Sequence, residues 1–91
     1  MNRLLALSII LLTASQVSAF QFEKLGDKSV YISNLQNFLI ERNYLKTKQS
    51  TGYFGKLTEK ALKEYQYDRG LKVTGVLDWD TMNTYKTENM E

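Results

Sequence analysis

The chain has 91 residues, with 12 basic and 10 acidic side chains and a formal net charge of +2. This near balance argues against a nucleic-acid-binding protein, because such proteins gather an excess of basic residues on one face. The chain has no cysteine and no histidine, so disulfides, the usual zinc ligands and the common nucleophile–base pairs are excluded. We therefore expect no enzyme activity, no metal and no cofactor.

The first 19 residues have the pattern of a secretory signal peptide. Arg3 provides a short positive segment, residues 4–12 form an apolar run, and small residues end the segment at Ala19. The apolar run is too short to span a hydrocarbon core of about 30 Å, which argues against an uncleaved membrane anchor. We expect cleavage after Ala19, a periplasmic or secreted location, and no membrane contact of the mature protein.

An extended lead-in at 20–24 and a turn precede the first predicted helix. Ser29 or Asp27 can cap a helix that begins near Val30, because their side-chain oxygens accept bonds from free backbone N–H groups. Apolar residues at spacings of three and four predict its buried face, which comprises Ile32, Leu35, Phe38 and Leu39. The helix should end near Asn43, since asparagine tolerates the left-handed conformation.

A turn-to-helix motif occurs twice in the chain. Its copies are TGYFGKLT at 51–58 and TGVLDWDT at 74–81, which share the spacing Thr-Gly-x-(Phe/Leu)-x-x-x-Thr. The first copy follows Leu45 with a connection three residues longer than the second copy has after Leu71. Gly52 and Gly55 can both take a positive φ, because glycine pays no Cβ penalty there.

The two copies predict the remaining helices. The second helix should run from Lys56 to about Arg69, where Gly70 stops it, and its inner face should comprise Leu57, Ala61, Leu62 and Tyr65. Asp78 can cap a third helix, with an inner face made by Leu77, Met82 and Tyr85. Residues 87–91 should form a frayed polar tail. The sequence thus predicts an all-α fold, a small closed three-helix bundle built from two helix–turn repeats.

Several polar residues within this pattern are interpreted as structural. Gln36 and Gln66 each follow a core residue, and their amides could bond to loop backbone groups that would otherwise lie unpaired. The hydroxyls of Thr58 and Thr81 should bond to the preceding turn. Asp78 and Asp80 lie at a helix start and are interpreted as a cap and a dipole partner, not as an acid/base pair.

An ordered set of residues between positions 25 and 85 makes the sequence recognisable. The set comprises Gly26-Asp27, Leu35-Gln36, Leu39, Tyr44, Gly52-Tyr53-Phe54-Gly55, Thr58, Ala61, Tyr65-Gln66, Gly70-Leu71, Gly75 and Thr81. It resembles the peptidoglycan-binding domain 1 family, and this resemblance implies a three-helix bundle at 25–86 that binds cell-wall peptidoglycan. The sequence departs from the family at Thr51 and Thr74, where an acidic residue is common, and at Tyr65, where phenylalanine is usual.

Aromatic side chains are the predicted ligand contacts, because the apolar faces of sugars stack on exposed rings. We expect such contacts from Tyr44, Tyr53, Tyr67 and Trp79. Lys56 joins them, because the start of the second helix carries no acid before position 59 and so presents free N–H groups and a positive dipole end. We hypothesise that a stem-peptide carboxylate of peptidoglycan docks there beside Tyr53.

Three functions remain open from the sequence. The first is an exported, monomeric, non-catalytic module that binds the glycan strand or the stem peptide of peptidoglycan. The second is a protein-interaction module that regulates a cell-wall hydrolase, because a similar fold forms the pro-region of matrix metalloproteinases. The third is a remnant of a larger cell-wall enzyme that has kept no ligand. None of the three involves nucleic acid.

Overall fold

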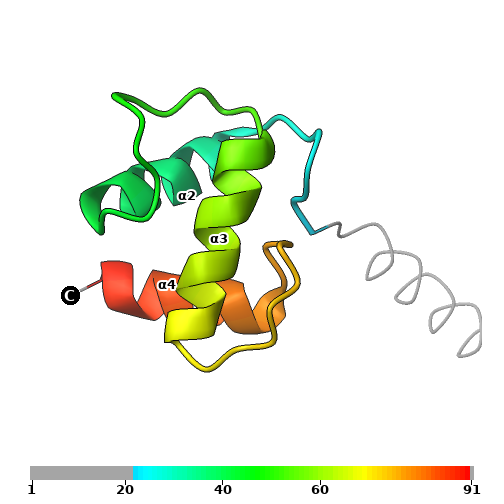
Figure 1. Cartoon of the computed structure of the whole chain (residues 1–91), viewed down its shortest axis with the longest axis vertical. Coiled ribbons are helices and arrows are strands. Elements are labelled where there is room, and N and C mark those ends of the chain that lie inside the picture. Colours follow the sequence, from blue (N-terminus) through cyan, green and yellow to red (C-terminus); the bar gives the residue numbers. More distant parts are fainter. Residues whose placement is uncertain (1–21, 91) are drawn as a thin grey trace, which may run out of the picture.

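Three α-helices make up the fold (Figure 1), as seen in a computed structural model that describes residues 22–90. They are α2 (Val30–Glu41), α3 (Lys56–Asp68) and α4 (Trp79–Asn89). In Figure 1, α3 runs across the other two helices, with α2 near its beginning and α4 near its end. The predicted all-α three-helix bundle is confirmed. The predicted signal peptide lies outside the described residues.

The lead-in before α2 connects the two turn motifs. Glu23 forms an antiparallel bridge with Leu77 in the second motif, and Lys28 forms another with Tyr53 in the first. The backbone N–H of Gly26 also donates to the carbonyl of Phe54 at 2.8 Å. The described part of the lead-in is therefore extended as expected, and it joins the two repeats.

The helix starts follow the predicted caps at two of three positions. The Ser29 hydroxyl accepts a bond from the N–H of Ile32 at 3.2 Å, and the Asp78 carboxylate accepts one from the N–H of Thr81 at 3.0 Å. The third helix start, at Gly55, has no side-chain cap. Gly55 has φ −92° and so does not use the positive φ that is open to glycine, because an N-cap residue adopts extended backbone.

The ends of α2 and α3 are equivalent to each other. Asn43 and Gly70 adopt left-handed conformations with φ of 68° and 70°. The next residue folds back in each case. The N–H of Tyr44 donates to the backbone carbonyl of Leu39, and the N–H of Leu71 donates to the backbone carbonyl of Gln66. Both predicted helix ends are confirmed.

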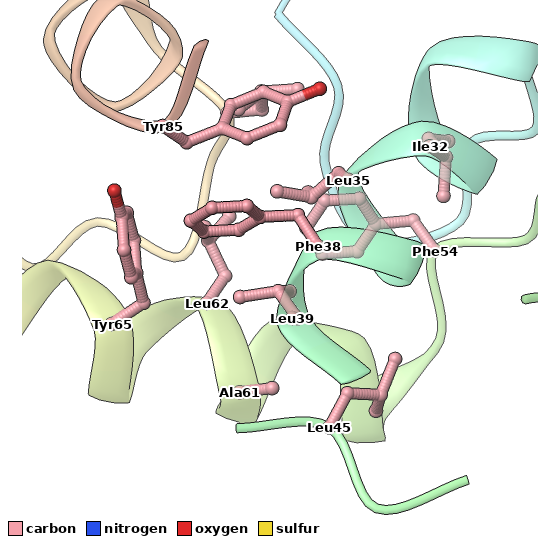
Figure 2. Close-up of a cluster of buried hydrophobic side chains, with 11 residues drawn as sticks. Ile32, Leu35, Phe38, Leu39, Leu45, Phe54, Ala61, Leu62, Tyr65 and Tyr85 are labelled. Atoms are coloured by element: carbon pink, nitrogen blue, oxygen red, sulfur yellow. The ribbon is translucent and has the colours of Figure 1, made fainter. Parts of the chain in front are cut away.

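Aromatic and aliphatic side chains from all three helices fill the core (Figure 2). The ring of Phe38 lies at its centre and makes edge-on contacts with Tyr65 and Tyr85, at centroid distances of 5.4 and 5.1 Å. Such contacts stabilise beyond the area they bury. A core of this kind explains how so short a chain folds without disulfides.

Two further expectations require correction. Leu57 is 64% exposed and does not belong to the inner face of α3. Thr58, one residue later and roughly 100° round the helix, takes the buried position instead. The helix α4 continues to Asn89 and covers most of the expected polar tail. The carboxylate of Glu88 anchors this last turn through bonds to Arg69 at 2.8 and 2.6 Å.

Candidate functional site

A buried glutamine holds the first turn motif. The side-chain oxygen of Gln36 accepts bonds from the N–H groups of Thr51 at 2.8 Å and Gly52 at 2.9 Å. Its amide nitrogen donates to the carbonyl of Tyr53 at 2.8 Å and to the hydroxyl of Thr58 at 3.0 Å. One side chain of α2 therefore positions both the turn and the beginning of α3.

Gln66 repeats this arrangement in the second motif. It accepts from the N–H groups of Thr74 and Gly75 at 2.9 and 3.0 Å. It donates to the carbonyl of Val76 at 3.0 Å and to the hydroxyl of Thr81 at 2.9 Å. The structural interpretation of both glutamines is confirmed. For Thr81 the predicted contact with the preceding turn also holds, since its hydroxyl donates to Asp78 at 2.6 Å.

The side chains of Thr51 and Thr74 hold the same turns. The hydroxyl of Thr51 accepts a bond from the N–H of Tyr53, and that of Thr74 accepts one from Val76, both at 3.2 Å. The following glycines have φ of 78° and 73°, which a residue with a Cβ adopts only at a cost. Both turns are therefore tightly defined, and their side chains point in fixed directions.

A groove opens beside the start of α3, where the first motif differs from the second. One end of it is a hollow of about 270 Å³, whose lining includes Tyr53, Gly55, Lys56, Leu57 and residues of the connection at 47–51. A second hollow of about 240 Å³ continues along α3 and is lined by Tyr44, Lys46, Lys60 and Glu64 among others. The two share Leu45 and Leu57. We call them together the α3 groove.

The α3 groove favours a negatively charged ligand. Lys46, Lys56 and Lys60 line it against a single acid, Glu64. The uncapped start of α3 lies at the same place, and its first N–H groups and dipole add positive potential that Glu59, the acid of the first turn, partly offsets. Exposed Tyr53 and Leu57 supply apolar surface beside these charges.

The structure places three of the five predicted ligand residues in the α3 groove and two outside its lining. Tyr53, Lys56 and Tyr44 line the α3 groove. Tyr67 is 76% exposed and lies on α3 three residues beyond Glu64, the last residue that lines the groove, so it adjoins the end of the groove without lining it. Trp79 lies at the start of α4 and contacts Phe22 edge-on at 6.2 Å, so it belongs to the surface around the lead-in.

Tyr44 is less free than the other two groove residues. Its hydroxyl donates to Asp68 at 2.7 Å, and its ring packs edge-on against Tyr65 at 5.5 Å. Burial raises the pKa of Tyr44, and the bond to Asp68 raises it further. Tyr44 therefore forms a fixed wall of the groove.

Sequence reasoning missed the charged and apolar groove residues Lys46, Leu57, Lys60 and Glu64 as ligand candidates. The signal that could have found them is the three-residue insertion after Leu45, because the longer connection forms one side of the groove. In residues 22–90 no group of three or more acidic residues is placed to hold a metal ion. That same part of the chain contains no helix long and apolar enough to cross a membrane.

Two repeats with matching left-handed helix ends, glutamine bonds and glycine turns define a small all-α repeat domain with a surface groove. The family described as "Putative peptidoglycan binding domain" matches residues 29–84, and the chain belongs to this family. The fold is similar to the crystal structure of the SleB N-terminal domain, with a TM-score of 0.69 and 26% sequence identity over 75% of this chain and 92% of that one. No curated protein matches the sequence.

Proposed function

We propose that this protein is an exported, non-catalytic module that binds peptidoglycan through the α3 groove. The observation that carries the proposal is the groove itself, in which Lys56 and an uncapped helix start lie beside exposed Tyr53 and Leu57. The stem peptides of peptidoglycan carry carboxylates, and N–H groups at a helix start bind such anions. The family relationship supports the same ligand class.

The chemistry of the chain supports a binding role over catalysis. The sequence has no histidine or cysteine, and the two aspartates at the start of α4 have other roles. Asp78 caps α4 and also accepts a bond from the Thr74 hydroxyl at 3.0 Å. Asp80 lies in the first helical turn, where its charge favours the dipole. Export is proposed from the signal-peptide pattern of residues 1–19, and the module is proposed to act as a monomer.

Sedimentation with purified sacculi tests this function. At low salt the protein should sediment with the wall, and Lys56→Ala and Tyr53→Ala should each weaken binding by about three- to tenfold, because each removes one contact. Lys72→Ala is the matched control for the lysine, since Lys72 is exposed and lies in the second connection. Tyr31→Ala is the matched control for Tyr53→Ala, because the ring of Tyr31 is also exposed and lies at the start of α2.

Two results would contradict the proposal. Protein that stays in the supernatant at low salt would argue against wall binding as such. Protein that sediments equally well with all four variants would show binding outside the α3 groove.

A second candidate function is regulation of a cell-wall hydrolase through protein contact. Val30 and Tyr31 favour it, because these consecutive residues are 67% and 61% exposed at the start of α2. Exposed apolar side chains that adjoin one another often mark protein interfaces. Co-purification with a wall hydrolase, lost in a Val30→Ser, Tyr31→Ser variant and kept in Lys56→Ala, would support this function over direct wall binding.

A further inference from the structure

The positive charge of the protein is concentrated beside the α3 groove. Residues 46–64 contain five lysines and two acids, whereas the remainder of residues 22–90 contains six basic and seven acidic side chains. The five lysines are all exposed, and we call them the lysine cluster: Lys46, Lys48, Lys56, Lys60 and Lys63. The nearly balanced charge of the whole chain conceals this local excess, because most of the acids lie elsewhere.

Three lysines of the cluster form a row along α3. Lys56, Lys60 and Lys63 follow one another at spacings of four and three residues, so they lie on the same side of the helix. Along the helix axis they are about 6 and 4.5 Å apart. The buried residues of α3, which include Ala61 and Tyr65, lie on the opposite side. The row therefore faces outward over most of the length of the helix.

Tertiary packing brings further positive charge to this row. Lys46 belongs to the connection before the first turn motif, yet it lines the same hollow as Lys60. Lys48 is exposed two residues later on that connection. At the other end, the Lys63 side chain lies against the second turn motif, because a Cβ placed on Gly75 would come within 2.8 Å of the Lys63 Cε. The cluster thus extends from the α3 groove to the second turn.

The charge of the cluster is only partly neutralised within the protein. Glu59 and Glu64 are each four residues from a lysine of the row, but they form no ion pair in residues 22–90. The ion pairs of this part of the chain join Glu88 to Arg42 and Arg69. Because like charges at helical spacings repel one another, the row is a feature that a negatively charged partner would stabilise.

A linear polymer of phosphate groups fits this row. A ligand with one carboxylate would meet one lysine, whereas a chain with regularly spaced charges can meet all three. Lysine binds phosphate as a point charge and needs no planar geometry, which suits a flexible polymer. Release of the counterions around such a polymer also favours binding.

The surroundings of the row favour a polymer without bases over a nucleic acid. Single-stranded nucleic acids bind where successive bases stack on aromatic rings within a basic groove. The exposed rings of Tyr53 and Tyr67 lie beyond the two ends of the row, and no aromatic residue stands between its lysines on the same side of α3. The cluster therefore supplies charge without a stacking surface between the charges.

We propose that the lysine cluster binds a linear polymer of polyol phosphates, with its phosphodiesters along the row formed by Lys56, Lys60 and Lys63. Lys46 and Lys48 add positive charge from the connection. This ligand is chemically distinct from peptidoglycan, and its binding does not depend on the stem-peptide contact proposed above.

Binding of fluorescently labelled poly(glycerol phosphate) at a series of salt concentrations tests the proposal. Fluorescence anisotropy measures the association constant. Its logarithm should fall linearly with the logarithm of the salt concentration, with a slope of about −2 to −3, as expected when three or four phosphates are neutralised. Single-stranded DNA with the same number of phosphates is the comparison ligand and should bind more weakly.

A triple variant tests the row itself. Lys56→Gln, Lys60→Gln, Lys63→Gln should weaken polymer binding by at least about tenfold at low salt and reduce the slope, because it removes three phosphate contacts. The matched control is Lys24→Gln, Lys72→Gln, Lys86→Gln, which removes the same net charge from exposed lysines outside the cluster. It should change binding by no more than about twofold, since distant surface charges are screened. Circular dichroism should show the same helix content in both variants.

A double variant separates this ligand from peptidoglycan. Lys48 and Lys63 belong to the cluster but do not line the α3 groove. Lys48→Gln, Lys63→Gln should weaken polymer binding by at least about threefold and leave sedimentation with sacculi stripped of phosphodiester polymers unchanged. If the parent protein binds the polymer but not the stripped sacculi, the function proposed for the α3 groove is wrong and the lysine cluster is still supported.

Three outcomes would overturn the proposal. The first is the absence of polymer binding at low salt. The second is an equal loss of binding in the two triple variants, which would assign the effect to net charge and not to the cluster. The third is tighter binding of the single-stranded DNA, which would make a nucleic acid the preferred partner.

Discussion

At the scale of single residues, two buried glutamines hold the fold together. Gln66 is fully buried, and its bonds reach two backbone N–H groups, one carbonyl and the hydroxyls of Thr74 and Thr81. Removal of its amide would leave the N–H groups of Thr74 and Gly75 without partners, whereas the Val76 carbonyl and both hydroxyls keep other bonds. Each such group costs about 1–3 kcal/mol, although water that enters the space can offset part of this.

Gln66→Ala should therefore lower the free energy of unfolding by about 2–4 kcal/mol, and Gln36→Ala should do nearly the same. Urea unfolding followed by circular dichroism measures both. Gln49→Ala is the control, since Gln49 is exposed in the connection before the first turn, and its effect should stay within about 0.5 kcal/mol. A cost below that value for Gln66→Ala would refute the structural role of the glutamines.

At the scale of elements, the uncapped start of α3 distinguishes it from α4. Asp78 caps α4 with its own carboxylate, and partial burial raises the pKa of this group while its bonds from Thr81 and Thr74 lower it more. Gly55 offers α3 no such group. The same motif therefore begins one helix whose start is capped within the chain and one whose start has no side-chain cap, where we propose that a carboxylate of the ligand docks.

Gly55→Asp should block the docking of a ligand carboxylate at the start of α3. Its carboxylate would bond to the first N–H groups of α3, as Asp78 does in α4, and would place a negative charge beside Lys56. Binding to sacculi should fall by at least about tenfold, because one charge-assisted contact is lost and a repulsion is added. Sedimentation measures the effect.

Gly55→Ala is the control that distinguishes the effect of the added charge from the effect of the added Cβ. Any Cβ at Gly55 would meet the Tyr53 ring at 3.2 Å, so both variants displace this exposed ring by a similar amount. Gly55→Ala should keep most of the binding. Equal loss in the two variants would assign the effect to Tyr53 and not to the helix start.

At the scale of the whole molecule, Glu88 joins the ends of all three helices. Its carboxylate accepts bonds from the Tyr65 hydroxyl and from Arg69 on one side, and pairs with Arg42 at 3.5 Å on the other. The hydrogen bond from Arg69 lowers the pKa of Glu88, and the bond from Tyr65 adds to this shift against the effect of burial. The Tyr65 hydroxyl thus contributes a bond that closes the bundle.

The lowered pKa of Glu88 predicts a loss of stability in acid. A carboxylate whose pKa is lower in the folded state stabilises the fold above the unfolded value of about 4.3. This stabilisation disappears as the pH falls through the lower folded value. Glu88→Gln should cost about 1–2 kcal/mol at pH 7, and the difference from the parent should shrink below about pH 4.

Urea unfolding at a series of pH values between 7 and about 2 measures this difference. Glu41→Gln is the control, because Glu41 is an exposed acid that forms no ion pair within residues 22–90. Its effect should stay within about 0.5 kcal/mol at pH 7. A Glu88→Gln difference that stays constant over the whole pH range would contradict the predicted role of this carboxylate.

The sequence by itself determined the helices, most of their caps and the repeated turns. These features rest on bonds between residues a few positions apart, such as Ser29 to Ile32 and Asp78 to Thr81, so local composition is enough to specify them. The buried stripe of α2 was equally readable from its spacing. Leu57 was misassigned because its spacing fits the edge of an apolar face, and only packing shows that Thr58 lies inside.

Only the tertiary structure decided the α3 groove and the closure of the bundle. Arg42 and Glu88 are 46 positions apart, and no periodicity in the sequence reports that they meet. The α3 groove needs the inserted connection to lie against α3, and the contact between Phe38 and Tyr85 needs α2 and α4, which are not consecutive, to lie together. The sequence specified each helix through short-range bonds, whereas long-range packing fixed which exposed side chains share a surface and so where a ligand can bind.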